Sequence, residues 1–248
     1  MEWWQILLIV LGSLSLLFVL SIFFYKQFFK RFWDIVLSGL ALIVLSPILL
    51  TLMIVGAIEM QGNPFFIQKR PGKKDKNGNE QIFKLIKFRT MSNKKDESGK
   101  LLPDEQRLNK YGIFLRSTSL DELPEFINVF VGNMSIIGPR PQLVKDMLFM
   151  SEEQRCRHNV KPGLSGLAQV NGRNNITWEQ KFNYDLLYIS SISVFGDIVL
   201  ILKTILKVFK RENTVRNGTA SDMDFGIWLL KEGKITEEYF NKTLEKIS

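Results

Sequence analysis

The residues best suited to chemistry lie in one segment, RSTSLDELPE, which runs from Arg116 to Glu125. Asp121 and Glu122 are adjacent carboxylates close to Arg116 in the chain. A helix N-terminus with a nearby arginine attracts phosphate, and a carboxylate there can attack phosphorus or hold Mg²⁺. The competing explanation is structural, because Ser119 and Glu122 have the spacing of a capping box and acidic residues are favoured in a first helical turn.

Further basic residues belong to stiff or loop-rich segments. Arg140 lies between two prolines, which fix φ and so present the guanidinium from a rigid backbone. Lys87 and Arg89 are two positions apart, so a strand would place them on one face. Arg173 ends a loop rich in glycine and asparagine. Several fixed arginines beside a carboxylate pair predict a diphosphate substrate, and the sequence has neither a GxxxxGK nor a GxGxxG loop to hold a nucleotide.

Composition excludes several classes of protein and site. The one cysteine, Cys156, excludes an internal disulfide and a thiolate zinc site, and the one histidine, His158, excludes a two-histidine metal site. With 46% hydrophobic residues in 248, the chain is not disordered. A net charge of +8 is compatible with nucleic-acid binding, but the basic residues are dispersed and no zinc-finger or RNA-binding aromatic signature is present.

The charge is divided between two parts of the chain. In residues 1–60 basic and acidic residues balance, so the whole net charge of +8 lies in 61–248. Residues 3–25 carry no charge, have aromatic residues at both ends and are long enough to span a bilayer. A cleaved signal peptide fits less well, because the start is acidic and no small-residue cleavage site follows. We therefore predict a retained membrane anchor over 1–27.

A second apolar stretch, 33–58, is interrupted by Ser46-Pro47. Proline removes a backbone donor and disfavours helix at the preceding residue. Both flanks of the stretch are basic, and positive charge marks the cytoplasmic side of a membrane. A helix-break-helix that enters and returns on one face satisfies both flanks, whereas two ordinary spans would leave the basic part outside. We predict a re-entrant membrane helix over 28–60.

The basic part contains local patterns typical of strands and helices. Residues 65–67 and 81–88 are apolar-rich and are separated by a polar segment, which predicts a hairpin with a long loop. Helices are expected over 104–115 and 121–131. The segment Ser151–Gln154 has the spacing of a capping box that opens a short helix.

Residues 193–211 form a basic amphipathic pattern in which Lys203, Lys207 and Lys210 recur opposite apolar residues. Such helices are typical of anionic membrane surfaces, and a core-packing helix with a solvated lysine face is the alternative. The predicted anchor favours surface contact. The tail, 213–248, begins polar and ends in two short helical patterns without evident chemistry.

Taken in order, these motifs resemble the bacterial sugar transferase family of monotopic polyprenyl-phosphate phosphoglycosyltransferases, from about Phe29 to Arg211. The segments that carry the resemblance are KRFWD with the later Ser-Pro break, QKRPG, KFRTM, RSTSLDELPEFINVFVGNMSIIGPRP, KPGLSGLAQVNGRN and WEQKFNYDLLYI. The chain is especially similar to short-form, bacillosamine-type phosphotransferases that act on N-acetylated amino sugars. The segment 1–27 is a departure, because minimal members lack it.

The resemblance implies transfer of a sugar 1-phosphate from a UDP-sugar to polyprenyl phosphate with release of UMP. Asp121 matches the nucleophile, which forms an aspartyl phosphosugar, and Glu122 matches a second carboxylate that assists attack by the polyprenyl phosphate. Mg²⁺ is expected as cofactor, held partly by Asp121, and Ser46-Pro47 matches the break of the re-entrant helix. Positions around the phosphates, and a further active-site acid, match Lys87, Arg89, Arg116, Arg140, Arg173 and Asp197.

The expected fold is α+β and mainly helical: a monotopic membrane protein with a re-entrant helix-break-helix, interfacial amphipathic helices and a small β-hairpin or sheet. The division that follows is an anchor over 1–27, a re-entrant helix over 28–60, a cytoplasmic interfacial catalytic domain over 61–212 and a tail over 213–248. The expected location is the bacterial inner membrane, with the catalytic domain on its cytoplasmic face.

The expected partners are a UDP-sugar, polyprenyl phosphate and membrane lipid, without nucleic acid, and a homodimer is the candidate assembly. The expected reaction is the first membrane step of glycoconjugate synthesis, in a capsule, exopolysaccharide, O-antigen or glycoprotein glycan pathway. The alternative function is a non-catalytic membrane scaffold or regulator that keeps the fold.

Overall fold

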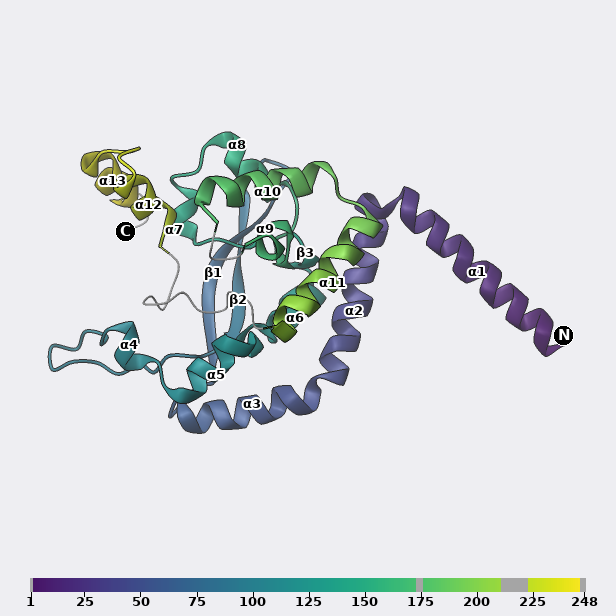
Figure 1. The fold of residues 1–248 in the computed structure, drawn as a ribbon, viewed down its shortest axis with the longest axis horizontal. Coiled ribbons are helices and arrows are strands. Elements are labelled where there is room, and N and C mark those ends of the chain that lie inside the picture. The colour runs from purple at the N-terminus through teal and green to yellow at the C-terminus, as the bar shows by residue number, and fades with distance from the viewer. Residues whose placement is uncertain (1, 173–175, 211–222, 246–248) are drawn as a thin grey trace.

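The computed structural model describes residues 2–172, 176–210 and 223–245, and it is mainly helical with two small sheets (Figure 1). In chain order the elements are α1 (Trp3–Phe23), the π-helical η1 (Tyr25–Phe29), α2 (Lys30–Val44), α3 (Ser46–Glu59), β1 (Phe65–Lys74), β2 (Glu80–Phe88), α4 (Asp104–Arg107), α5 (Lys110–Thr118), the 3-10 helix η2 (Leu120–Glu122), α6 (Glu125–Val131), β3 (Ser135–Ile137), α7 (Val144–Met147), α8 (Glu152–Arg155), the 3-10 helix η3 (Cys156–Asn159), β4 (Gly163–Ser165), α9 (Leu167–Val170), α10 (Trp178–Ser190), α11 (Val194–Lys210), α12 (Phe225–Lys231) and α13 (Glu237–Leu244). The predicted α+β class, mainly helical with a small sheet, is confirmed.

Helix α1 extends away from the rest of the protein, whereas α2 and α3 run along the edge of the protein (Figure 1). The axes of α2 and α3 are bent by 63° at a break where Pro47 lies in the first turn of α3 and the Ser46 hydroxyl donates to the Ile43 carbonyl oxygen at 2.7 Å. In the described part of the chain, no single helix has both the length and the hydropathy needed to cross a membrane, and the bent pair α2–α3 has them jointly. The predicted break at Ser46-Pro47 is therefore confirmed, and its re-entry into a membrane stays a prediction.

Helix α2 packs against α6, and one arginine fixes the contact. The Arg31 guanidinium donates to the carbonyl oxygens of Val129 and Phe130, at 2.6 and 2.7 Å. These are among the last carbonyls of α6, which have no partner within the helix, and a cation is favourable at this end of a helix dipole. The bent apolar pair α2–α3 is thus joined directly to the basic part of the protein.

The predicted hairpin is confirmed, but its predicted long loop is wrong. β1 and β2 pair antiparallel, with Phe65 opposite Phe88, and β1 continues to Lys74 although its second half is polar. The turn is short because the Asp75 carboxylate accepts from two backbone N–H groups within it and Gly78 adopts φ +84°. The second sheet is a short parallel pair of β3 and β4.

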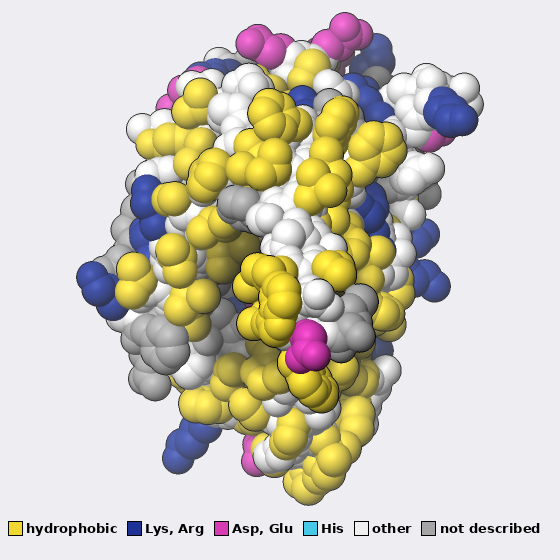
Figure 2. All heavy atoms as spheres, turned by 90° about the vertical axis from the view of Figure 1, so that its right-hand side faces the viewer, with side chains coloured by type: hydrophobic (Ala, Val, Ile, Leu, Met, Phe, Trp, Pro, Cys, Tyr) yellow, Lys and Arg dark blue, Asp and Glu magenta, His cyan; other side chains and the backbone are white. Residues whose placement is uncertain are grey.

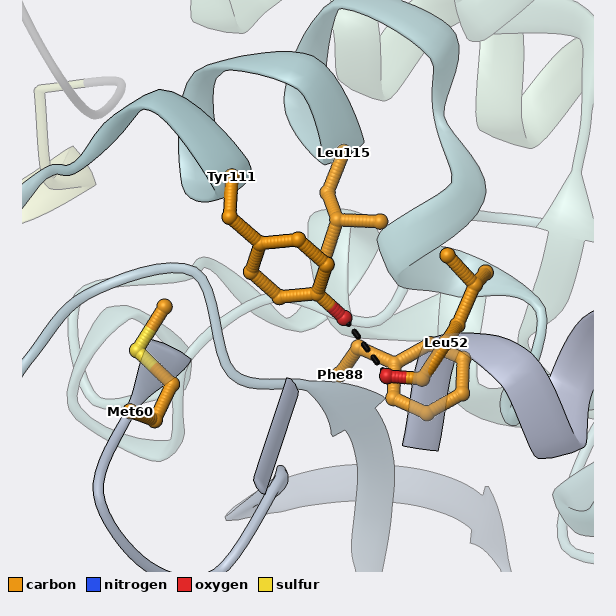
Figure 3. Packing of buried hydrophobic residues seen from close by; sticks show 5 residues of the cluster. All are labelled: Leu52, Met60, Phe88, Tyr111 and Leu115. Carbon is orange, nitrogen blue, oxygen red and sulfur yellow. Dashed lines mark hydrogen bonds between the residues drawn. The ribbon is translucent and has the colours of Figure 1, made fainter. Parts of the chain in front are cut away.

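Helix α3 is held to β2 and α5 by a buried cluster consisting of Leu52, Met60, Phe88, Tyr111 and Leu115 (Figure 3). Leu115 is completely inaccessible to solvent. Burying side chains of this size contributes about 1.5–3 kcal/mol each. The cluster therefore fixes the apolar helix α3 against the elements that lead into the RSTSLDELPE segment.

The helix predicted over 104–115 is two helices in the structure. Leu108 is extended and forms an isolated bridge with Met91, which separates α4 from α5. The Asn109 side chain then caps α5 by accepting from the Gly112 N–H at 2.8 Å. The capping box predicted at Ser151 and Gln154 is confirmed at the start of α8.

Helix α11 packs on the core with one side and leaves other apolar side chains exposed, and its contact with a membrane surface stays a prediction. One side is buried against the protein core through Leu200, which is 5% exposed. Other apolar side chains of α11 are exposed: Phe195, Ile198, Val199, Leu202, Ile205, Leu206 and Val208. Apolar side chains cover much of the face in Figure 2, the side of the molecule where α1, α2 and α11 lie in Figure 1.

The tail of the chain forms part of the folded protein. Helices α12 and α13 are separated at Gly233, which adopts φ +66°. Phe225, at the start of α12, is 2% exposed and packs against Trp178 and Phe182 of α10. Its backbone N–H donates to the buried Asp146 carboxylate at 2.9 Å. The described tail is therefore docked on the domain that precedes it.

Candidate active site

The carboxylates Asp121 and Glu122 lie on the 3-10 turn η2, between α5 and α6. Helix α5 ends at Thr118 and is followed by Ser119, which adopts the left-handed conformation with φ 58°. Pro124, which has no N–H, then precedes α6, so the single helix predicted over 121–131 is wrong in its first turn. Ser119 makes no capping hydrogen bond to η2, so the capping-box explanation of this motif is also wrong.

Two cations from distant parts of the chain converge on Glu122. The Lys87 ammonium, on β2, lies 3.0 Å from Glu122 Oε1, and the Arg140 guanidinium lies 2.5 Å from the same oxygen. Lys87 also lies 2.9 Å from Oε1 of Glu125. The predicted grouping of Lys87 and Arg140 with the carboxylate pair is thus present in the fold.

Burial and neighbouring charges perturb the ionisation of this group. Burial, together with the adjacent Glu122 carboxylate, raises the pKa of Asp121, and Lys87, Arg140 and Arg116 act in the opposite direction. Glu122 raises the pKa of Arg140 against the effect of burial. The ionised form of Asp121 is thus disfavoured in this site, and an additional positive charge beside it would stabilise that form.

Arg116 is on the last turn of α5, and its Nε donates to the Thr90 hydroxyl at 3.0 Å. Burial lowers its pKa, whereas the Asp121 carboxylate raises it. This opposing effect shows that the guanidinium is within electrostatic reach of Asp121. Arg116 therefore belongs to the group of cations around the carboxylate pair, as expected.

The predicted cation Arg89 forms no ion pair with the carboxylate pair among the described residues. β2 ends at Phe88, one residue before Arg89, whose backbone N–H donates to the Pro64 carbonyl oxygen at 2.7 Å. Arg173 lies outside the described residues.

Asp197 lies in a buried joint between helices, and its predicted role near the phosphates stays a prediction. Asp197 is 3% exposed, and its carboxylate accepts from the hydroxyls of Tyr25 and Tyr188, at 2.7 and 2.9 Å. The Lys30 ammonium lies 2.5 Å from the same carboxylate. Its oxygens thus join η1 and α2 to α10 and α11.

Glu125 is a member of the group that the motif alone did not single out. It is 1% exposed, and burial together with Glu122 raises its pKa, while Lys87 lowers it. The sequence signal is the single charged residue at the start of the helix EFINVFV. Lys87 is therefore shared between two carboxylates, Glu122 and Glu125.

The donor set suits a divalent cation only if the substrate completes it. No group of three or more His, Cys, Asp or Glu side chains among the described residues could hold a metal ion. Asp121 nevertheless offers carboxylate oxygens in a place where added positive charge is favourable. Mg²⁺ is commonly bound through one or two carboxylates together with substrate phosphates, so the residues present fit Mg²⁺ in that mode.

An apolar groove of about 600 Å³ lies beside the carboxylate turn. Its lining residues come from α3, both strands of the hairpin and the start of α6: Ser46, Pro47, Leu49, Leu50, Met53, Phe65, Phe88, Pro124 and Ile127. Pro124 follows Glu122 by two positions and Phe88 follows Lys87 directly. The groove therefore brings apolar surface next to the charged group.

Residues 25–211 match the sequence family described as bacterial sugar transferase. The chain belongs to this family. An uncharacterized sugar transferase of Bacillus subtilis, EpsL, is 42% identical over 183 residues, which are 74% of this chain and 88% of that protein. Membership of the bacterial sugar transferase family makes the chain an enzyme, a sugar-phosphate transferase.

Two relatives carry names that state their reaction. The UDP-glucose:undecaprenyl-phosphate glucose-1-phosphate transferase of Klebsiella pneumoniae is 40% identical over 191 residues, which are 73% of this chain and 40% of that protein. The transferase of the same name from Escherichia coli is 39% identical over 196 residues, with 74% and 41% of the two chains covered. The bacterial sugar transferase described here thus spans less than half the length of these two relatives.

Proposed function

We propose that the protein transfers a sugar 1-phosphate from a UDP-sugar to polyprenyl phosphate and releases UMP. The observation that carries this proposal is the carboxylate pair Asp121 and Glu122 on a turn surrounded by Lys87, Arg116 and Arg140. Such a group suits a diphosphate substrate, because arginine and lysine bind phosphate oxygens strongly. Names of relatives that use UDP-glucose and undecaprenyl phosphate support the same reaction.

In the first half-reaction, a carboxylate oxygen of Asp121 attacks the sugar-bearing phosphorus. The bond from that phosphorus to the UMP oxygen breaks, the electron pair leaves with UMP, and an aspartyl phosphosugar forms. Lys87, Arg116 and Arg140 stabilise the negative charge that develops on the phosphate oxygens. Mg²⁺, when bound by Asp121 and the substrate, neutralises part of the diphosphate charge.

In the second half-reaction, an oxygen of polyprenyl phosphate attacks the same phosphorus, and the bond to Asp121 breaks. Glu122 is adjacent to Asp121 and assists this attack. The product carries a diphosphate between lipid and sugar, and the Asp121 carboxylate is restored. Because the two substrates react in turn, ping-pong kinetics are expected.

The lipid substrate explains why apolar surface lies beside a charged site. We propose that the enzyme acts at the cytoplasmic face of the bacterial inner membrane, with α2–α3 as a re-entrant hairpin. The apolar groove between Pro47 and Pro124 supports access of an isoprenoid chain to the carboxylates. The exposed apolar side of α11 supports contact with lipid.

The sugar is proposed from the resemblance to bacillosamine-type enzymes, and it is an N-acetylated amino sugar. The named relatives act on UDP-glucose, so a hexose is the competing substrate. A screen of UMP release should therefore pair UDP-N-acetylamino sugars with UDP-glucose and UDP-galactose, each with Mg²⁺ and polyprenyl phosphate. The highest kcat/KM on an N-acetylamino sugar supports the proposal, and the highest value on a hexose contradicts it.

The nucleophile is tested with Asp121→Asn, which keeps the shape of the side chain but removes its negative charge. UMP release should fall to background, and the intact mass should no longer increase by one sugar phosphate when the UDP-sugar is supplied without acceptor. Glu153→Gln, on the exposed surface of α8, is the matched control and should behave as wild type. Full activity of Asp121→Asn would refute the assignment, and a wild-type chain inactive on every UDP-sugar would favour the scaffold alternative.

The topology is tested with single cysteines in a Cys156→Ser background. Gly62→Cys and Lys242→Cys lie after the bent helix pair and on α13, and both should react with a membrane-impermeant thiol reagent only from the cytoplasmic side. Glu2→Cys reports the side on which α1 begins. Labelling of residues 62 and 242 from opposite sides would contradict a cytoplasmic catalytic domain.

A further inference from the structure

The backbone that carries Arg140 is held by charged side chains that do not belong to the carboxylate group. The Arg140 carbonyl oxygen accepts from Nη2 of Arg157 at 2.7 Å. The next carbonyl oxygen, of Pro141, accepts from Nη1 of Arg70 at 3.1 Å. Arg140 is flanked by prolines, which cannot donate backbone hydrogen bonds, so these side chains supply contacts that regular secondary structure would otherwise provide.

Arg157 is itself fixed in one position. It is 2% exposed, and its Nε and Nη2 atoms lie 3.0 and 2.6 Å from Oδ2 of Asp185 on α10. Its guanidinium carbon lies 5.6 Å from the ring centroid of Phe182. The buried Nη1 atom has no hydrogen-bond partner among the described residues, so Nε and Nη2 make the contacts that fix the side chain. Such contacts matter because removing the charge of an arginine from water is costly.

The other end of the segment is fixed by the small parallel sheet. The Gly138 N–H donates to the Ser165 carbonyl oxygen at 2.8 Å, and the Gly163 N–H donates to the Pro139 carbonyl oxygen at 2.9 Å. A Cβ at Gly138 would lie only 2.6 Å from the Lys161 carbonyl oxygen, so the two strands approach closely here. With both ends held, the direction of the Arg140 side chain toward Glu122 is determined by its backbone.

We propose that Arg157, held by Asp185, is a positioning residue that keeps the Arg140 guanidinium on Glu122. Arg157 acts through the backbone of Arg140 and is not expected to contact substrate. The kinetic test of this inference rests on the proposed function, because it measures UMP release. Small displacements of a positioned group reduce rates strongly, by up to about a hundredfold per ångström.

The kinetic test is a double-mutant cycle between Arg157→Met and Arg140→Met, with UMP release as the readout. Arg157→Met should lower kcat by about tenfold or more in the wild-type background, and by less than about twofold when Arg140 is already methionine, because residues that act as a unit are not additive. Equal losses in both backgrounds would indicate a structural role and overturn the proposal.

The matched control is Arg155→Met. Arg155 lies two positions before Arg157 and makes a two-point contact with the Glu80 carboxylate, which is not part of the Arg140 segment. It should change kcat by less than about twofold. A loss equal to that of Arg157→Met would mean that any broken arginine–carboxylate pair has this effect, which would refute a specific positioning role.

A second measurement does not depend on activity. The rate at which phenylglyoxal modifies Arg140, followed by mass spectrometry of the full chain after digestion, should rise severalfold in Arg157→Met and stay unchanged in Arg155→Met. If the wild type releases no UMP, the proposed function fails, and this rate still decides the positioning role. An unchanged rate would overturn it. If Arg157→Met does not fold, Asp185→Asn takes its place in both measurements, with the same direction expected and the same outcomes decisive.

Discussion

The Tyr111 hydroxyl on α5 donates a hydrogen bond of 2.8 Å to the Leu52 carbonyl oxygen on α3 (Figure 3). This bond joins the apolar bent pair to the helix that ends just before the Asp121 turn. Gly56 makes room for it, because a Cβ at Gly56 would lie 2.9 Å from the hydroxyl oxygen. The position of α3 and the position of the reactive turn are thus set by the same buried contact.

Replacing Tyr111 with phenylalanine should lower the free energy of unfolding by about 1 kcal/mol, because it removes one buried hydrogen bond and keeps the ring. Thermal unfolding in detergent measures this effect. Tyr239→Phe, in which the exposed hydroxyl lies on α13, is the control and should be neutral. Equal changes in the two variants would contradict a stabilising role for the Tyr111 bond.

The joint at Asp197 should show strong coupling between its charges. Asp197→Leu leaves the Lys30 ammonium without its buried partner and should cost about 3 kcal/mol of stability. Adding Lys30→Met removes the stranded charge, so the double variant should be less destabilised than the sum of the single ones by at least about 1 kcal/mol. Lys26→Met, on the exposed side of η1, is the control and should have little effect on the free energy of unfolding. Strictly additive losses in the Lys30 and Asp197 variants would show that the pair is not coupled.

Lys87 should set the acid limb of the pH–rate profile for UMP release. The reaction needs Asp121 in its ionised form, and Lys87 lowers the pKa of that carboxyl. Lys87→Gln removes this effect, so the pKa of Asp121 rises and the acid limb of kcat/KM should move to higher pH. Lys84→Gln, an exposed lysine of the same strand, should leave the limb in place. A shift to lower pH in Lys87→Gln would contradict the assignment.

His158 should make stability depend on pH in mildly acidic solution. Burial and the neighbouring Arg157 lower its pKa from 6.5 to about 4, against the effect of Glu80. As pH falls, the unfolded chain therefore binds the proton before the folded protein does. The contribution of neutral His158 to the free energy of unfolding is complete above pH 6.5. It is lost as pH falls toward 4, by at most about 3 kcal/mol. Chemical denaturation across this range should show a smaller loss in His158→Gln, which has no histidine left to titrate. An unchanged slope would exclude His158 as its source.

Local chemistry explains which parts of this fold are predictable from the sequence. The α2–α3 break follows from Pro47 alone, and the hairpin follows from two apolar runs with a glycine turn. The sequence pattern underestimates the length of β1 because the second half of this strand, beginning at Arg70, is polar and lacks the apolar alternation that marks a strand. The extended Leu108 that divides α4 from α5 depends on a bridge to Met91, which no local pattern shows.

In the candidate active site, too, local motifs are predictable from the sequence and contacts between distant residues are not. The motif around Asp121 identifies the carboxylates, and proline on both sides of Arg140 identifies a fixed cation. The joint at Asp197 could not be predicted, because its partners Tyr25 and Lys30 are 172 and 167 residues away in the chain. Tertiary contacts of this kind are set by packing, which a motif match does not show.

Phe225 lies beyond the shared family region, 25–211, yet it completes an aromatic core with Trp178 and Phe182. The region that matches the family is therefore shorter than the part of this protein that folds together. A fragment cut at the family boundary would expose the rings of α10 to water and is expected to aggregate. A chimera that replaces only the C-terminal segment of this chain would change one side of this core, so both sides have to be replaced together.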